Sequence, residues 1–124
     1  MRKSIAVVDD DEIYKIIIGK MISSSELFDK VYLFDDSRNA LEVLSNGDIP
    51  APEIILLDLN MPHLDGWEFL DHLKEQKPEL YSESSIYIVT SSISQSDQDR
   101  ARSYEELKGF ISKPITSKFL KEIA

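Results

Sequence analysis

Apolar residues in this chain gather in short continuous runs, and longer segments with helical spacing separate those runs. Five runs of this kind predict β-strands, and they lie at residues 5–8, 31–34, 54–57, 86–89 and 109–111. Each run is apolar throughout instead of alternating with polar positions. Continuous apolar runs are typical of parallel strands whose two faces are both covered by helices.

Five segments between and after these runs carry apolar side chains at helical spacing. In the first segment Ile13, Ile16, Ile17 and Met21 share one face, which we expect to pack against the sheet. The apolar positions of the other four segments are, in order, Ala40, Leu41 and Leu44; Trp67, Leu70 and Leu73; Ala101 and Tyr104; Phe119, Leu120 and Ile123. The fourth set is the thinnest, so we expect that helix to be the least stable.

Residues with known helix-end preferences mark several boundaries. Ser37 is expected to cap the second helix, and Gly47 suits its end. The third helix should end before Pro78, and Thr116 should cap the last helix. The polar stretch 75–85 is the longest connection, and we expect it to be a surface loop.

Five strands that alternate with five helices predict a doubly wound α/β fold with a parallel sheet. A length of 124 residues suits one domain, which we expect to span 1–124. The net charge of −9 opposes binding to nucleic acid and to anionic membranes. The chain has no cysteine, and no apolar run approaches the roughly 18 residues of a membrane span. We therefore expect a cytoplasmic protein without disulfides or thiolate metal sites.

Polar residues follow the predicted strands at their carboxyl ends. Asp9 and Asp10 follow the first run, and Asp58 follows the third. Thr90 follows the fourth run, and Lys113 comes shortly after the fifth. Because the carboxyl ends of parallel strands share one edge of a sheet, we expect these residues to converge there. Each residue alone could be a helix cap or a loop residue, but their common placement favours a functional site.

The three carboxylates of this group indicate a site for a hard cation. Clustered carboxylates repel one another unless a cation or a proton intervenes. Oxygen ligands without cysteine favour Mg²⁺ or Mn²⁺. A carboxylate can also accept a phosphoryl group, and such a transfer needs positioning and charge neutralisation more than covalent chemistry. The residues therefore predict a metal-assisted phosphoryl acceptor.

The chain also resembles the receiver domain of two-component response regulators, specifically the single-domain type, along essentially its whole length. The residues that carry the resemblance are Val7-Val8-Asp9-Asp10, Leu57-Asp58-Leu59-Asn60-Met61-Pro62, Leu64-Asp65-Gly66, Val89-Thr90-Ser91 and Lys113-Pro114. Each motif is weak alone, but five in this order on the expected strand ends are highly specific. The resemblance implies a flavodoxin-like fold with strand order 2-1-3-4-5.

The resemblance further implies roles for individual residues. Asp58 would be the phosphorylated residue. Asp10, Asp58 and the backbone carbonyl of Asn60 would bind Mg²⁺, and Asp9 would contribute mainly through bound water. Lys113 would pair with the phosphoryl group.

Other implied roles concern the signalling switch and the lifetime of the phosphorylated state. Thr90 would turn inward to hydrogen-bond the phosphoryl group, and Phe110 occupies the place of the family's switch aromatic. The bond between Lys113 and Pro114 would be cis. Asn60 and Ser92 would adjust the access of water to the phosphoryl group.

The function that the resemblance implies is a phosphorylation-dependent signalling switch with no enzymatic activity beyond its own phosphorylation and dephosphorylation. Its partners would be a sensor histidine kinase or histidine phosphotransfer protein and a downstream output protein. An alternative is an aspartate-based, Mg²⁺-dependent phosphatase, but that chemistry wants a second aspartate where this chain has Asn60. A nucleotide-binding module is disfavoured because no glycine-rich phosphate loop follows the first run.

Some residues near these motifs have simpler explanations. Asp11 and Glu12 suit the N-terminus of a helix, where acidic side chains are favourable. Trp67 has helical spacing with Leu70 and is expected to be a packing residue. For Phe110 the sequence leaves two roles open, namely a core residue and a true switch.

Overall fold

The computed structural model describes residues 2–91 and 94–124. Its centre is a parallel sheet of five strands in the order β2-β1-β3-β4-β5, which confirms the expected topology. The strands are Lys3–Val8 (β1), Phe28–Phe34 (β2), Ile54–Leu57 (β3), Ser85–Thr90 (β4) and Leu107–Ser112 (β5). The central strand β3 is buried at all four positions, as its unbroken apolar run predicts.

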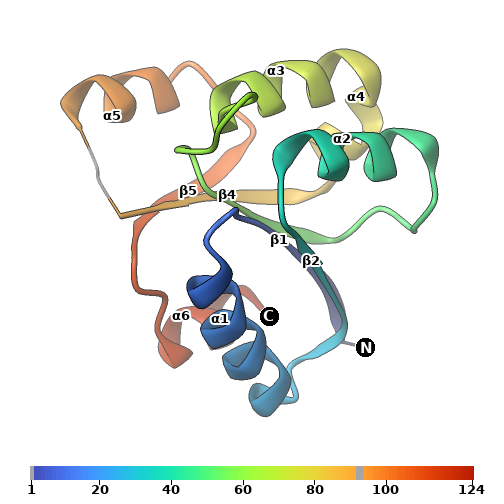
Figure 1. The fold of residues 1–124 in the computed structure, drawn as a ribbon, viewed down its shortest axis with the longest axis vertical. Coiled ribbons are helices and arrows are strands. Elements are labelled where there is room, and N and C mark those ends of the chain that lie inside the picture. The colour runs from blue at the N-terminus through green and yellow to red at the C-terminus, as the bar shows by residue number, and fades with distance from the viewer. Residues whose placement is uncertain (1, 92–93) are drawn as a thin grey trace.

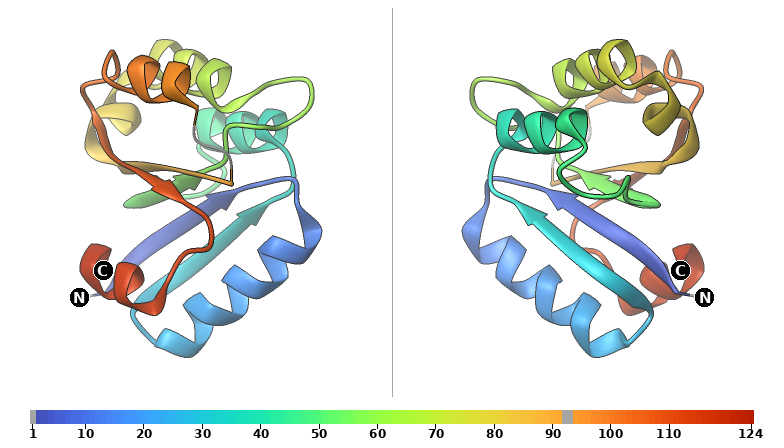
Figure 2. Two further views of the ribbon diagram at one scale, coloured as in Figure 1. Left: turned by 90° about the vertical axis from the view of Figure 1, so that its left-hand side faces the viewer. Right: turned by 90° about the vertical axis from the view of Figure 1, so that its right-hand side faces the viewer.

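Helices cover both faces of the sheet and form three layers with it. They are Glu12–Ser25 (α1), Ser37–Asn46 (α2), Gly66–Gln76 (α3), Pro78–Glu83 (α4), Gln95–Ala101 (α5) and Ser117–Ile123 (α6). Helices α2 to α5 lie on one face, and α1 and α6 lie on the other (Figure 1). The two side views in Figure 2 show the same layers, with α1 running beneath β1 and β2. Two separate apolar clusters fill the space between the layers.

Helix α1 packs on the sheet with a different face from the one that the sequence suggested. Ile13, Ile16 and Ile17 are 72%, 56% and 55% exposed, whereas Ile18 and Ile22 are 1% exposed. The prediction was wrong for these three exposed isoleucines, whereas Met21 does pack against the apolar cluster. Residues 16–18 are three isoleucines in a row, so apolar side chains occur on two sides of the helix.

The buried side of α1 could not be recognised from the sequence because it includes a charged residue, Lys15. Its side chain is buried, and its ammonium group forms ion pairs with Asp35 and, at 3.2 Å, with Glu12. A lysine that is paired in this way can lie on the inner face of a helix with its aliphatic stem among apolar neighbours.

The stretch 75–85 is not a simple surface loop. It contains α4, which has Pro78 in its first turn. Helix α4 buries Leu80 and Tyr81 in the apolar cluster between the sheet and α3, called the cluster under α3 below. Proline suits the first turn of a helix because its missing N–H has no helical partner there. The apolar pair lies among polar residues, so the sequence pattern did not reveal it. The described residues therefore form six helices where five were expected.

The helix ends agree with the sequence in some places and differ in others. Thr116 caps α6 by accepting a hydrogen bond from the Phe119 amide at 3.1 Å, and Gly47 ends α2 with φ of 73°. The cap of α2, however, is Asp36, which accepts from the Asn39 amide at 2.7 Å. Ser37 is instead the buried first residue of the helix, and its hydroxyl donates to the Leu64 carbonyl.

Helix α5 buries none of its residues, and it ends at Ala101, so Tyr104 lies beyond it. Side chains from neighbouring segments hold it instead. The ring of Trp67 on α3 stacks on Tyr104 with centroids 5.1 Å apart and donates its indole N–H to Asp97 at 3.2 Å. The Tyr104 hydroxyl donates to Asp71 at 2.8 Å. Trp67 is therefore a packing residue, as expected, and it fastens α5 to α3.

No helix in the described part of the chain combines the length and the apolar character that crossing a lipid bilayer requires.

Candidate functional site

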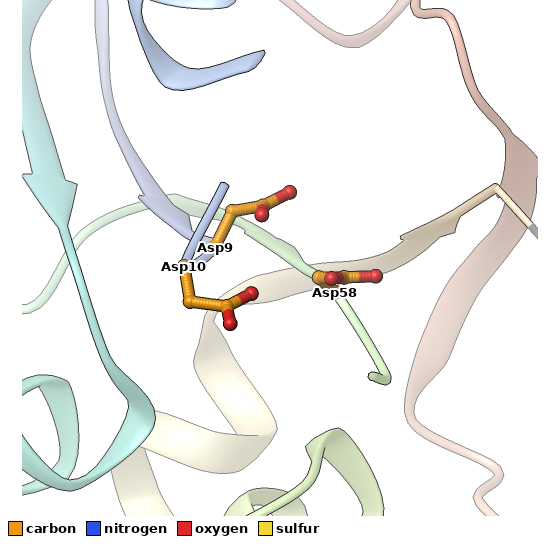
Figure 3. Close-up of side chains that lie close together, drawn as sticks. All are labelled: Asp9, Asp10 and Asp58. Carbon is orange, nitrogen blue, oxygen red and sulfur yellow. The ribbon is translucent and has the colours of Figure 1, made fainter. Parts of the chain in front are cut away.

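Three carboxylates meet at the carboxyl edge of the sheet. Asp9 and Asp10 follow β1, and Asp58 follows β3. One carboxylate oxygen from each residue lies within 4.8 Å of those of the other two. Figure 3 shows Asp9 and Asp10 reaching from the end of β1 toward Asp58. Asp9 and Asp58 are only 1% and 7% exposed, so two of the three charges lie in a poorly hydrated position.

Backbone hydrogen bonds continue the sheet by one residue and fix Asp9 and Asp58 in place. The Asp58 amide donates to the Val8 carbonyl at 3.0 Å, and the Asp9 amide donates to the Phe34 carbonyl at 3.2 Å. Asp11 caps α1 by accepting from the Tyr14 amide at 3.1 Å, which confirms its expected place at the helix N-terminus. The edge that carries Asp9, Asp10 and Asp58, called the acidic rim or simply the rim, is therefore built on paired strand ends and a capped helix.

Lys113 brings a positive charge to this rim from the end of β5. Its ammonium nitrogen lies 2.7 Å from Asp9 Oδ2 and 3.9 Å from Asp58 Oδ2. Its backbone amide donates to the Thr90 carbonyl at 2.9 Å, and its bond to Pro114 is cis, as expected. The ion pair with Asp9 is the closer of the two contacts.

Thr90 and Asn60 contact each other at the same edge of the sheet. Thr90 is fully buried at the end of β4, and its hydroxyl oxygen accepts a hydrogen bond from the Asn60 side-chain amide at 3.3 Å. The structure thus brings together Asp9, Asp10, Asp58, Asn60, Thr90 and Lys113. Ser92, for which a role in water access was expected, lies outside the described residues.

Phe110 lies farther away, within β5. It is half-buried, pairs in register with Ile88 and packs against the cluster under α3. It also lines a hollow of about 540 Å³ between α5 and β5, together with Tyr104 and Leu107. A ring at the wall of such a hollow has room to change position.

The chemistry of Asp58 differs from that of an ordinary aspartate. Burial, followed by the charge of Asp9, raises the pKa of Asp58 to about 6. Lys113 and the backbone N–H groups of Asn60 and Leu59 oppose this rise. Because the ionised form is held in a position that penalises its charge, a cation at the rim would stabilise that form.

Gly66 closes the loop that follows Asp58. Its amide donates to the Leu59 carbonyl at 2.9 Å. A Cβ atom at this position would lie 2.7 Å from the Asp58 carbonyl oxygen and 2.9 Å from the Leu59 Cα. The start of α3 therefore presses directly on the backbone of the acceptor residue, and only glycine allows that approach.

Sequence reasoning missed Tyr14. Its ring centroid lies 4.1 Å from the Lys113 ammonium nitrogen. The only signal was its position three residues after Asp11, which puts it in the first turn of the helix that starts at the rim.

Comparison with known proteins then identifies the family. The profile described as response regulator receiver domain matches residues 5–124. The chain belongs to the response regulator receiver domain family. Receiver domains signal through phosphorylation, so the chain is a signalling domain of that class.

Relatives and solved structures agree with this assignment. The two-component response regulator from Cytophaga hutchinsonii superposes with a TM-score of 0.89 at 25% identity, covering 99% of this chain and 95% of that one. The Mn²⁺-bound form of response regulator Rcp1 superposes with a TM-score of 0.76 at 25% identity, covering 98% and 88%.

A third similar protein is a protein-glutamate methylesterase/protein-glutamine glutaminase of Syntrophomonas wolfei. It is 30% identical over 115 residues, which cover 91% of this chain and 30% of the relative. The chain spans less than a third of the length of the methylesterases that it matches.

Proposed function

We propose that Asp58 accepts a phosphoryl group from a phosphohistidine on a sensor histidine kinase or histidine phosphotransfer protein. A carboxylate oxygen of Asp58 forms a bond to phosphorus as the bond between phosphorus and the imidazole nitrogen breaks. The observation that carries this proposal is the setting of Asp58, a buried carboxylate with two further carboxylates within 4.8 Å and the Lys113 ammonium at 3.9 Å. A nucleophile, a cation site and a positive side chain thus meet at one point.

The acidic rim fits Mg²⁺ or Mn²⁺, since its donors are all oxygens. Asp10, Asp58 and the Asn60 carbonyl would hold the ion, which would neutralise charge on the phosphoryl oxygens. Both oxygens of Asp9 already have partners, because Oδ1 accepts from the Asp11 amide at 2.9 Å and Oδ2 pairs with Lys113. This supports a role for Asp9 through bound water.

Lys113 and Thr90 would recognise the transferred group. Lys113 is close enough to Asp58 to pair with a phosphoryl oxygen, and it would then exchange part of its contact with Asp9 for that oxygen. The Thr90 hydroxyl would donate to another phosphoryl oxygen, so its present contact with Asn60 would change. Both changes depend on the phosphoryl group, as a switch requires.

The exposed face of α1 is the surface that we propose for the phosphodonor protein. Ile13, Ile16 and Ile17 project from the helix that begins at the acidic rim, and Leu33 on β2 is 45% exposed beside them. Ile16 and Leu33 also line a groove of about 550 Å³ between α1 and β2. A protein that delivers its phosphoryl group to Asp58 must touch the surface around the rim, and clustered exposed apolar residues mark interaction sites.

The output signal would leave through α5 and β5. Movement of the Thr90 hydroxyl toward a phosphoryl group vacates space, and Phe110 on the neighbouring strand would shift into it. The thin anchoring of α5 supports this route, because none of its residues is buried. We propose no activity on other substrates. The side chain two residues after Asp58 is the amide of Asn60, which cannot serve as the acid and base of a phosphatase.

Labelling with a small phosphodonor tests the central step. Incubation with acetyl phosphate and Mg²⁺ should add one phosphoryl group by intact-mass spectrometry, and Asp58→Asn should abolish the addition. Asp11→Asn is the matched control and should still be labelled. Equal labelling of Asp58→Asn would disprove the assignment of the acceptor.

Two further measurements test the partner and output surfaces. Ile17→Glu should slow transfer from a histidine phosphoprotein that labels the normal chain, while labelling by acetyl phosphate stays unchanged. Beryllofluoride, which imitates the phosphoryl group, should shift amide signals mainly in residues 94–115, and Thr90→Ala should mute these shifts. Shifts confined to α1 and α2 would contradict the proposed output route.

A further inference from the structure

Tyr14 lies against the positive side chain of the site. It belongs to the first turn of α1, and its ring centroid is 4.1 Å from the Lys113 ammonium nitrogen. The Lys113 side chain is largely enclosed, with 14% of it exposed. An ammonium group over the face of an aromatic ring is attracted by the negative charge of that face.

The ammonium group therefore has three neighbours. Asp9 contacts it at 2.7 Å, Asp58 lies at 3.9 Å, and the ring of Tyr14 covers a further side. The carboxylates attract the ammonium toward the centre of the rim, where a cation would compete for the same charges. The ring carries no net charge, so it can hold the ammonium whether or not a cation binds.

We propose that Tyr14 is a positioning residue whose ring holds the Lys113 ammonium beside Asp58, and thereby sets the rate at which Asp58 is phosphorylated. This inference rests on the proposed function of Asp58. The contact between the Tyr14 ring and the Lys113 ammonium joins the start of α1 to the end of β5.

The proposed role belongs to the ring of Tyr14 and not to its hydroxyl group. It is buried and has no hydrogen-bond partner among the described residues. Burial, together with the negative charges of Asp9 and Asp58, raises the pKa of Tyr14, so the hydroxyl stays protonated and the ring stays neutral. A neutral ring without the hydroxyl should hold the ammonium equally well, and this distinction makes the proposal testable.

The experiment compares Tyr14→Phe with Tyr14→Leu. Tyr14→Leu removes the ring and should slow labelling of Asp58 by acetyl phosphate about 3- to 30-fold, the range expected for loss of a partly buried cation–π contact. Tyr14→Phe keeps the ring and should stay within about twofold of the normal rate. Tyr32→Leu, which removes a partly buried tyrosine on β2, is the matched control and should label normally.

An NMR signature separates positioning from a merely structural effect. The ε-methylene protons of Lys113 should show an upfield ring-current shift, with the signal assigned by its absence in Lys113→Arg. The shift should persist in Tyr14→Phe and disappear in Tyr14→Leu. A normal labelling rate in Tyr14→Leu, or an equal loss of rate in Tyr14→Phe, would overturn the proposal.

The NMR measurement uses the unphosphorylated protein, so it reports on Tyr14 even if Asp58 is not the acceptor. Failure of the proposed function would appear separately, as labelling that survives Asp58→Asn. If the ring-current shift is absent from the normal protein, the ring does not hold Lys113, and the inference about Tyr14 alone is wrong.

Discussion

Helices α1 and α5 follow β1 and β4, two of the strands whose ends form the site, but the protein holds the two helices in opposite ways. Helix α1 has 14 residues, and it buries Ile18, Ile22 and the paired side chain of Lys15. Helix α5 has seven residues, and none of them is buried. The indole N–H of Trp67 on α3 donates to Asp97 on α5, and Tyr104, which lies beyond α5, stacks on the same Trp67 ring.

This difference separates a side of the domain that the apolar core anchors from a side that few contacts hold. The first turn of α1 carries Tyr14 against Lys113, so this contact of the site comes from a helix that the apolar core anchors. The side that would report phosphorylation depends on a few polar and aromatic contacts, each of which can be exchanged for another.

Removing a buried contact of α1 should have the largest effect on stability. Ile18→Ala should lower the free energy of unfolding by about 2–4 kcal/mol, because it leaves a cavity in a packed core. The control is Ile17→Ala on the exposed side of the same helix, which should change that energy by less than about 0.5 kcal/mol. Urea denaturation of the two variants gives both values. Equal effects would show that α1 is not anchored by the face seen in the structure.

The buried charge of Asp58 should make the metal-free protein sensitive to pH. Its pKa in the folded state is about 6, above its ordinary value, so between roughly pH 4 and 6 the folded protein binds more protons than the unfolded chain. The contribution of Asp58 to the free energy of unfolding therefore falls as pH rises through this window. Asp58→Asn should lack the fall, and near pH 7 it should be more stable by up to about 3 kcal/mol.

Denaturation of both proteins in a chelator at pH 5 and pH 7 measures this difference. Added Mg²⁺ should reduce it, because a cation offsets the penalty that burial places on the charge. An Asp58→Asn variant that is less stable than the normal protein at pH 7 would contradict the raised pKa.

Loosening α5 should have a smaller and more local effect. Tyr104→Ala removes the ring that stacks on Trp67 and the hydroxyl that donates to Asp71, and it should destabilise the protein by about 1–2 kcal/mol. Hydrogen exchange should accelerate in residues 95–101 and stay unchanged in α1. Tyr104→Phe keeps the stack and should show a weaker effect. Equal acceleration in both helices would show that they unfold as one unit.

The smallest expected effect distinguishes the two neighbouring aspartates at the start of α1. Asp10→Ala should weaken Mg²⁺ binding more than Asp11→Ala does, because Asp10 belongs to the carboxylate cluster and Asp11 caps the helix. Asp11→Ala should instead cost about 1 kcal/mol of stability through loss of the cap. Calorimetric Mg²⁺ titration and thermal melts separate the two effects. The reverse ranking for Mg²⁺ would place the metal ligands one residue later.

Much of the fold and of the site could be predicted because the signals were local. Each strand contains a continuous apolar run, although β2 and β5 begin with further residues that include charged ones. Asp9 and Asp58 directly follow such strands and Thr90 ends another, and these strand ends share one edge. Helix α4 was missed because Leu80 and Tyr81 are only two apolar residues among polar ones. The inner face of α1 was misjudged because a buried lysine resembles a surface residue until its partner Asp35 is known. The contact between Tyr14 and Lys113 joins positions 99 residues apart, and no periodic pattern connects them.

The close packing at Gly66 affects how a mutational screen of this domain should be interpreted. A Cβ atom there would meet the backbone of Asp58 and Leu59, so every replacement should displace the acceptor loop. In a screen that selects for signalling, position 66 would score as sensitively as Asp58 itself, although it contributes no reactive group. Only a parallel screen for folded protein would reveal which of the two positions is intolerant because of its shape and which because of its charge.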